Sequence, residues 1–436
     1  MSKLVELLLN DTMRINRDTY LKELTEKRWN GAVKVITGLR RSGKSYLLFE
    51  IFKDYLLSEG VDEKDIIEID LDRMENAGLR HPIKLYEEIK SRCSDGRKMY
   101  VLIDEIQKVS EIDNPYVEDG GKLTFYDTLN SLLGLKYLDV YVTGSNSKML
   151  SSDVLTMFRG RGDEVRVHPL SFKEYYDTVG GDRNLAFERY QKYGGMPFLL
   201  SITSDESVER YLKNLFSETY LKDIEERHGI ERMDVMEGTI DVLCSSIGSL
   251  TNPTNIANTI SKGAKENTVR SYIRYLQDAF LFSEAKRFDV KGRDYLKYPM
   301  KYYCEDIGLR NARLEFRQVE TTHIIENIVY NELRNRGFNV DVGVVPMFEK
   351  DKSGNVTKKQ KEIDFIINKG GMKVYIQSAF SISDDDKMAQ EKTSLLRTGD
   401  SFPKIILRMD TLGKWYDDDG IIHMNLIDFL LDKESI

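Results

Sequence analysis

Short apolar runs alternate with helical stretches through the first part of the chain. Apolar runs at 32–37, 66–70, 99–103 and 139–143 predict buried strands. Between them, 45–55 and 83–93 carry apolar residues at helical spacing and predict helices. Strands that alternate with helices predict an α/β domain in which helices cover both faces of a parallel sheet.

The pattern changes in the second half. From residue 255 it predicts a helix, a turn at Gly263, a second helix over 265–278 and strands at 280–282 and 298–303. Two helices followed by two strands are typical of a winged helix-turn-helix. Further along, 324–329 favours a helix, and 361–367 and 374–377 favour strands.

Composition narrows the class of protein. A length of 436 residues predicts two or three domains, at about 150 residues each. Apolar residues make up 41% of the chain and the mean hydropathy is −0.44, which excludes a disordered or membrane-embedded protein. No apolar run approaches the roughly 18 residues that a spanning helix needs, so we expect a cytoplasmic protein without a membrane partner.

Residues 38–45 match the phosphate-binding motif G-x-x-x-x-G-K-[ST], and a predicted strand and helix flank them in the required order. Lys44 is expected to reach the β and γ phosphates, and Ser45 to ligate Mg²⁺. ATP is the expected nucleotide, because the chain has no guanine-reading N-K-x-D string. The candidate nucleotide-binding residues are Gly38, Arg40, Arg41, Ser42, Gly43, Lys44, Ser45 and Tyr46.

Polar residues follow the next two central strands. Asp104 is expected to hold the Mg²⁺ shell and Glu105 to polarise the attacking water, because both follow a strand that should end beside the phosphate loop. After the strand at 139–143, Asn146 is the candidate that senses the γ phosphate, with Ser145 as the second choice. Alternatively, these two residues cap the next helix.

Arg161 is the third candidate catalytic residue. It lies in the string Phe-Arg-Gly-Arg-Gly at 158–162, and its guanidinium is suited to neutralise charge on the transferred phosphoryl group, as an arginine finger does. The finger would act in its own subunit or on a neighbour in a homo-oligomer. The alternative is an arginine exposed on the surface or paired with a carboxylate.

The strings at 35–45, 102–107 and 143–147 resemble the bacterial and archaeal AAA-type ATPases whose C-terminal half is a domain of unknown function. The resemblance continues through 158–161, 168–172 and 193–197 to 376–377, so it spans nearly the whole chain. It implies that Gly38, Gly43, Lys44, Ser45, Asp104 and Glu105 hold the nucleotide roles.

The resemblance also implies an order of domains. A P-loop ATPase core at 1–168 is followed by a helical lid at 169–235 and a winged-helix segment at 236–305. The last part, 306–436, is an α/β module similar to restriction endonucleases.

DNA is a candidate partner of the winged-helix segment. Residues 255–303 contain ten basic and five acidic residues, although the whole chain has a net charge of −8. Such an asymmetry is typical of a surface that contacts phosphates, and Lys265, Arg270 and Arg274 lie on its second helix. The alternatives are a solvated basic face and a docking surface for the acidic ATPase core.

The C-terminal module carries part of a nuclease pattern. Restriction-endonuclease folds need acidic metal ligands on a helix and a strand, then Glu or Gln and a Lys two residues later on the next strand. Glu326, Asp364 and Gln377 fit this pattern, but Ala379 stands at the lysine position. We therefore expect the module to serve binding or assembly, with Lys361 and Lys373 as candidates to replace the missing lysine.

Three functions remain open. The first is a Mg²⁺-dependent ATPase that works as a nucleotide-controlled switch on a bound partner, for which DNA is a candidate. The second is a nucleotide-gated nuclease, and the third is a scaffold that binds ATP without turning it over.

Overall fold

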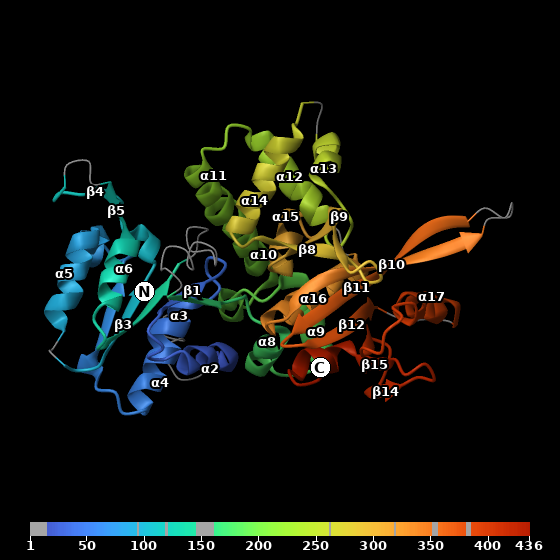
Figure 1. Cartoon of the computed structure of the whole chain (residues 1–436), viewed down its shortest axis with the longest axis horizontal. Coiled ribbons are helices and arrows are strands. Elements are labelled where there is room, and N and C mark those ends of the chain that lie inside the picture. The colour runs from blue at the N-terminus through green and yellow to red at the C-terminus, as the bar shows by residue number, and fades with distance from the viewer. Residues whose placement is uncertain are drawn as a thin grey trace. The chain divides into compact units, whose positions relative to one another are not determined.

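The computed structural model describes residues 15–93, 96–117, 121–144, 161–260, 263–317, 320–350, 356–380 and 385–436 (Figure 1). Contacts divide the chain into two compact units. The first holds Arg14–Pro169 together with Asp278–Phe280, and the second holds Leu170–Gln277 and Leu281–Ile436.

A five-stranded parallel sheet forms the centre of the first unit, in the order β2-β3-β6-β1-β7. Its strands are β1 (Val33–Thr37), β2 (Ile66–Asp70), β3 (Met99–Asp104), β6 (Leu138–Thr143) and β7 (Gly162–Arg166). The first four match the predicted strands, because a strand buried on both faces is a run of apolar residues.

Helices cover both faces of this sheet. One face packs against α5 (Pro82–Arg92) and α6 (Phe125–Leu133), and the other against α2 (Asp18–Glu26) and the helix that follows the phosphate loop. That helix comprises α3 (Lys44–Tyr46), a π-helical stretch (Leu47–Phe52) and α4 (Lys53–Ser58). The predicted α/β architecture with helices on both faces is confirmed.

The second unit begins with helices. They are α8 (Phe172–Val179), α9 (Arg183–Tyr193), α10 (Asp205–Asn214), a π-helical stretch (Leu215–Leu221), α11 (Lys222–His228), α12 (Met233–Ser245), α13 (Pro253–Ile260), α14 (Glu266–Asp278) and α15 (Ile307–Arg313). The antiparallel strands β8 (Phe282–Asp289) and β9 (Asp294–Cys304) follow α14, so the predicted order of helices and strands is present. A winged helix remains a prediction.

An eight-stranded mixed sheet completes the second unit, in the order β14-β15-β13-β12-β11-β10-β8-β9. Its other strands are β10 (Asn339–Lys350), β11 (Val356–Lys369), β12 (Met372–Ala379), β13 (Lys404–Arg408), β14 (Lys414–Tyr416) and β15 (Ile422–Asn425), with α16 (Thr321–Asn335), α17 (Asp385–Leu396) and α18 (Leu426–Leu431) beside them. Because β8 pairs with β10, this sheet continues across the proposed boundary between 305 and 306. The restriction-endonuclease-like fold remains a prediction.

Candidate nucleotide site

The phosphate loop lies at the carboxyl end of β1, and its first glycine is required by the fold. Gly38 has φ of +134°, and a Cβ built there would lie 2.1 Å from the backbone oxygen of Val167. The same segment is held by a bond from the Val167 N–H to the Thr37 oxygen (2.8 Å). Only glycine fits this close approach of two backbones, so the loop follows β1 at a fixed angle.

Lys44 is buried within the loop and, among the described residues, its ammonium bonds only to backbone oxygens. Its ammonium donates to the oxygens of Gly38 (3.0 Å) and Leu39 (2.9 Å). Burial lowers the pKa of Lys44 to about 8, although Glu105 and Asp104 act in the opposite direction. The lysine therefore holds a positive charge near neutral pH that no direct carboxylate contact neutralises among the described residues, as phosphate binding requires.

Asp104 is the centre of a hydrogen-bonded chain at the end of β3. It accepts from Ser45 Oγ (2.8 Å) and from Thr143 Oγ1 (2.5 Å), and Thr143 Oγ1 in turn accepts from the Glu105 N–H (3.0 Å). Burial raises the pKa of Asp104 to about 6, against the two hydroxyl donors. Ser45 and Asp104 thus present adjacent oxygens, which fit a Mg²⁺ ion of a bound nucleotide.

Glu105 is half-buried next to this chain and has a left-handed backbone, with φ of +54°. Its carboxylate accepts a hydrogen bond from Gln107 Nε2. A constrained backbone and a neighbouring amide fix where the carboxylate lies, which suits a residue that positions water.

Three contributors to the site were missed by sequence reasoning. Thr143 looked like the last residue of a strand, yet it joins Asp104 to Glu105. Arg17, which is 2% exposed, donates to the backbone oxygens of Ser42 (3.2 Å) and His168 (2.5 Å) and so braces the loop. Gln107 is the third. No sequence motif marks Arg17, whereas a polar residue at a strand end beside the acidic pair was a usable signal for Thr143.

The other predicted nucleotide-site residues lie as follows. Arg40, Arg41, Ser42 and Gly43 complete the loop, and Tyr46 is half-buried on the first turn of the helix. Arg41 has φ of +64° and an exposed side chain. Asn146, with its alternative Ser145, lies outside the described residues.

Arg161 is not brought to the phosphate loop within this chain. Its backbone oxygen accepts from the N–H of Val33, the first residue of β1, and its side chain is exposed. The phosphate loop follows the last residue of β1, about five residues or roughly 16 Å along the strand. A finger in the same subunit does not fit this position, and a role on a neighbouring subunit remains a prediction.

In the second unit, the residues of the nuclease pattern do meet, but a lysine lies among them. Lys301 of β9 places its ammonium 2.8 Å from Glu326 Oε1 and 2.6 Å from Glu362 Oε1. Asp364 accepts from the Ser378 N–H (2.8 Å) and from Gln377 Nε2 (3.3 Å). Burial acts to lower the pKa of Lys301, but Glu326, Asp364 and Glu362 outweigh it and raise that pKa.

This arrangement differs from the one expected. The lysine that contacts these acidic residues is Lys301, which neutralises carboxylates that a metal ion would need. A role of Lys361 or Lys373 in place of the missing lysine remains a prediction. Ala379 is buried in the apolar core of the sheet. Across the residues that the structure describes, no group of three His, Cys, Asp or Glu could hold a metal ion.

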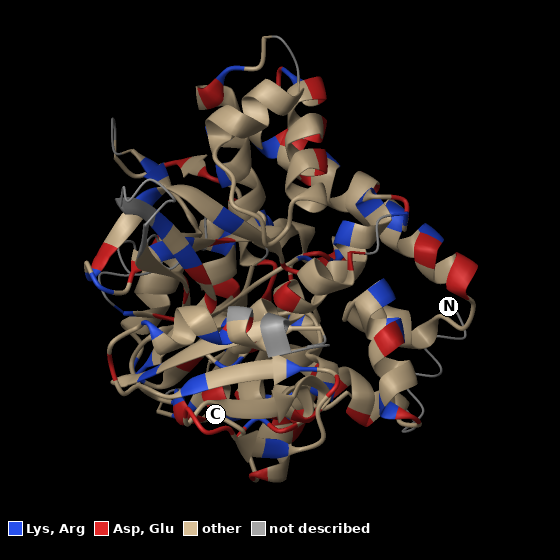
Figure 2. Ribbon diagram, turned by 90° about the vertical axis from the view of Figure 1, so that its right-hand side faces the viewer, with Lys and Arg blue, Asp and Glu red and all other residues tan. Residues whose placement is uncertain are grey.

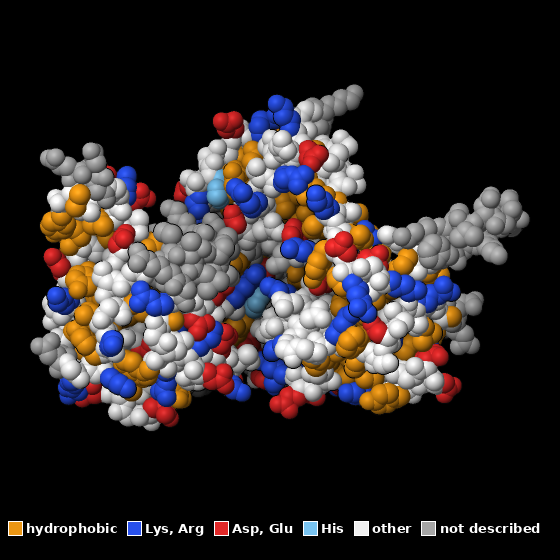
Figure 3. Space-filling view, viewed as in Figure 1, with side chains coloured by type: hydrophobic (Ala, Val, Ile, Leu, Met, Phe, Trp, Pro, Cys, Tyr) orange, Lys and Arg blue, Asp and Glu red, His pale blue; other side chains and the backbone are white. Residues whose placement is uncertain are grey.

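Fewer basic side chains of residues 255–303 are available to contact a nucleic acid than the composition of this segment suggests. Lys265, Arg270 and Arg274 are exposed, but Arg270 pairs with Glu266 and donates to Tyr298. Arg287 and Lys301 are buried, at 7% and 4% exposure. Figure 2 shows acidic residues interspersed with basic ones along the helices, and Figure 3 shows basic side chains near the base of the β10–β11 hairpin.

No helix in the described ranges is both long and apolar enough to cross a membrane.

Comparisons with known proteins concern both units. Residues 30–176 match a family model described as an AAA domain, and residues 184–320 match one described as a domain of unknown function, DUF8612. An uncharacterised protein of Haemophilus influenzae is 33% identical over 430 residues, which cover 96% of this chain and 98% of that protein. An uncharacterised protein of Methanocaldococcus jannaschii is 28% identical over 397 residues, which cover 87% of this chain and 80% of that protein.

Among solved structures, the Walker-type ATPase of Pyrococcus abyssi is similar to this chain. The two are 17% identical, with a TM-score of 0.47, and the match covers 70% of this chain and 97% of that one.

Proposed function

Because the chain belongs to the family of AAA-type P-loop ATPases, we propose that it hydrolyses ATP with Mg²⁺ and acts as a nucleotide-controlled switch on a bound partner. One observation carries the proposal. The hydrogen-bonded chain from Ser45 through Asp104 and Thr143 to the Glu105 N–H joins the phosphate loop to the residue that would position water.

Each residue of the nucleotide site has a defined task in the proposed reaction. Backbone N–H groups of 38–45 would cradle the phosphates, and Lys44 would exchange its two carbonyl contacts for phosphate oxygens. Ser45 and Asp104 would hold Mg²⁺, which supplies charge neutralisation at the phosphates when bound. Glu105 would accept a hydrogen bond from the attacking water, while Thr143 keeps Asp104 and Glu105 in a fixed relation.

The switch itself requires a link from the γ phosphate to the rest of the protein. We assign this link to Asn146 and, across the interface of a homo-oligomer, to Arg161. DNA is the proposed partner, through the exposed Lys265, which directly precedes α14, and the exposed Arg274 within α14.

Phosphate release from Mg-ATP tests the proposal, with and without double-stranded DNA. Lys44→Ala and Glu105→Gln should each reduce turnover by about 100-fold or more, because one removes the phosphate contact and the other the water contact. Glu105→Gln should retain ATP binding. The exposed Lys84 provides a matched control, and Lys84→Ala should keep wild-type turnover.

Two outcomes would contradict the proposal. Turnover that survives Lys44→Ala would place hydrolysis elsewhere, and nucleotide binding without turnover by the wild type would favour the scaffold. Stimulation by DNA would support DNA as the partner. A nuclease is not proposed, because Lys301 occupies the acidic cluster and Ala379 lies in the core.

A further inference from the structure

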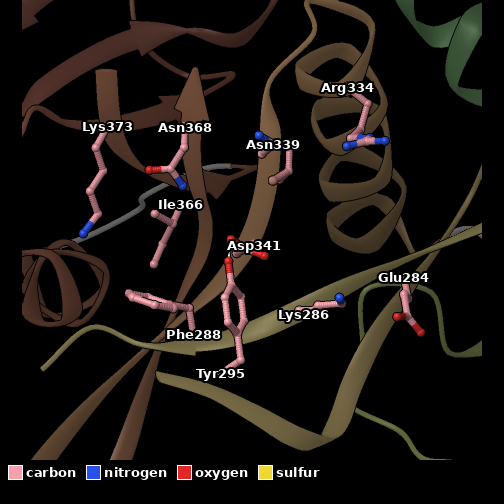
Figure 4. Close-up of a pocket in the computed structure, with 11 residues that line it drawn as sticks. Glu284, Lys286, Phe288, Tyr295, Arg334, Asn339, Asp341, Ile366, Asn368 and Lys373 are labelled. Atoms are coloured by element: carbon pink, nitrogen blue, oxygen red, sulfur yellow. Dashed lines mark hydrogen bonds between the residues drawn. The ribbon is translucent and has the colours of Figure 1, made fainter. Parts of the chain in front are cut away.

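The second unit contains a cavity of about 600 Å³ that none of the functional motifs explains (Figure 4). This volume lies in the usual range for small-molecule sites, about 300–1,000 Å³. Strands β10, β11 and β12 supply its floor, the β8–β9 hairpin one wall, and α16 part of the rim.

Three polar residues lie side by side across the floor. In the sheet register, Asn368 of β11 pairs with Asn339 of β10 on one side and with Lys373 of β12 on the other. Among the described residues, the two side-chain amides have no hydrogen-bonding partner. Each amide therefore offers the cavity both a donor and an acceptor.

Two aromatic rings form the wall. Phe288 and Tyr295 face each other across the hairpin, with ring centroids 5.2 Å apart and an interplanar angle of 65°. Tyr295 is 54% exposed, yet its hydroxyl donates to Asp341 Oδ2 (3.0 Å), which fixes the ring beside the cavity. An exposed, fixed ring is suited to stack on a flat ligand.

Three cations line the same cavity, namely Lys286, Arg334 and Lys373, together with the carboxylates of Glu284 and Asp341. In the described part of the chain, Lys286 and Arg334 have no carboxylate within 4.0 Å, and the Lys373 ammonium lies 4.0 Å from Asp400. Burial lowers the pKa of Lys373, with Asp400 opposing the effect. Lys286 and Arg334 are thus available to an anion, and Lys373 would divide its contacts between that anion and Asp400.

We infer that this cavity binds a nucleotide at a site separate from the phosphate loop. The base lies against Tyr295 and Phe288, and the amides of Asn339 and Asn368 bond to its polar edge. The phosphate contacts Lys286, Arg334 and Lys373. The same chemistry comes from a free nucleotide or from one residue of a single-stranded nucleic acid.

Binding to the full-length protein tests the inference. The first probe is a mixed-sequence DNA strand of about ten nucleotides with a 5′-hydroxyl end, titrated at low salt into the wild type. The second is cytidine monophosphate, titrated into Lys44→Ala so that the phosphate loop contributes nothing. Tyr295→Ala should weaken the binding of at least one probe about tenfold, because it removes the stacking surface.

Matched variants separate the cavity from general effects. Tyr416→Ala removes a comparably exposed tyrosine from the same unit, and Lys297→Ala removes an exposed lysine from the same hairpin as Lys286. Both should bind like the parent, whereas Lys286→Ala should bind more weakly. If DNA binding depends on Tyr295, the ligand of the cavity is a single-stranded nucleic acid. If only the binding of cytidine monophosphate depends on Tyr295, the ligand is a free nucleotide.

The inference fails if neither probe binds. It also fails if Tyr295→Ala and Lys286→Ala bind no worse than Tyr416→Ala and Lys297→Ala. Because neither arm requires ATP turnover, these results are independent of the proposed ATPase activity.

Discussion

Lys44 and Lys301 are both buried lysines near acidic residues, but their surroundings differ. Lys44 contacts two backbone oxygens, and Asp104 nearby is held by hydroxyl groups. Lys301 contacts the carboxylates of Glu326 and Glu362 directly. Charges in the first site are available to a nucleotide and a metal ion, whereas charges in the second neutralise one another.

The difference shows why a set of residue types does not define a site. Both places combine acids with a lysine, as phosphate and metal chemistry require. The arrangement of these residues decides whether the ammonium attracts an anionic ligand or takes the place that a metal ion would occupy among the carboxylates. Removing one partner of a buried ion pair leaves the other charge buried without a counter-charge, which lowers the free energy of unfolding.

The largest expected effect is the difference in stability between substitutions at Lys301 and at Lys44. Lys301→Met leaves the buried Glu326 without a counter-charge, and the half-buried Glu362 loses its partner as well, so we expect the free energy of unfolding to fall by about 3–5 kcal/mol. Lys44→Met removes a charge that burial already disfavours, so its change should stay within about 1 kcal/mol. Urea unfolding of the nucleotide-free proteins measures both.

A second substitution checks the cause. Glu326→Gln added to Lys301→Met should recover part of the lost stability, because it removes one unpaired carboxylate. Equal losses for Lys301→Met and Lys44→Met would mean that the two environments do not differ as described.

The pH dependence compares the two buried aspartates. Burial raises the pKa of both Asp104 and Asp364 to about 6, above the ordinary 3.8. Between about pH 4 and 6 the native state keeps protons that the unfolded state loses, so stability falls as pH rises, by up to about 3 kcal/mol per group. Asp104→Asn should flatten this decline and stabilise the nucleotide-free protein above pH 6.

Asp364→Asn should give a smaller gain, because the ionised Asp364 accepts from the Ser378 N–H, the Ser378 hydroxyl and Gln377. Unfolding curves between pH 4 and 8 test this, with the exposed Asp113→Asn as the control. The assignment would be contradicted if the wild type gained stability as the pH rises from 4 to 6, and if neither Asp104→Asn nor Asp364→Asn changed that dependence.

Ligand-induced stabilisation separates the same two aspartates by function. Mg-ADP at about ten times its dissociation constant should stabilise the wild type by about 1.4 kcal/mol. Asp104→Asn should lose most of the part that depends on Mg²⁺, and Asp364→Asn should keep it. Thermal unfolding with ADP alone, with Mg²⁺ alone and with both provides the measurement, and an equal loss in the two variants would contradict the site.

Local pattern was enough to predict four of the five strands of the parallel sheet, the phosphate loop and the acidic pair, because each is a short segment with its own signature, whereas β7 was not predicted. Partners contributed by distant segments were not visible. Arg17 braces Ser42, Lys301 reaches Glu326, and Arg161 lies at the amino end of β1 because β7 runs parallel to it. Strand order and register decide these contacts, and the local pattern of hydrophobic residues predicts neither.

The same distinction between available and paired charges applies to DNA. Exposed Lys265 and Arg274 have no carboxylate within 4.0 Å among the described residues, whereas Arg270 already pairs with Glu266. Replacing Lys265 or Arg274 by Ala should therefore lower the slope of log affinity against log salt by about 1. Arg270→Ala should lower it by less, because that guanidinium must first give up Glu266.

Filter binding across a salt series measures these slopes, with Lys84→Ala as the control. Equal decreases for all three variants would mean that phosphate readily displaces Glu266, so that the ion pair does not limit contact. No binding of the wild type at low salt would exclude α14 as a DNA-contacting surface. A decrease confined to Lys265→Ala and Arg274→Ala would show that pairing, not the number of basic residues, determines which charges of this segment reach a phosphate.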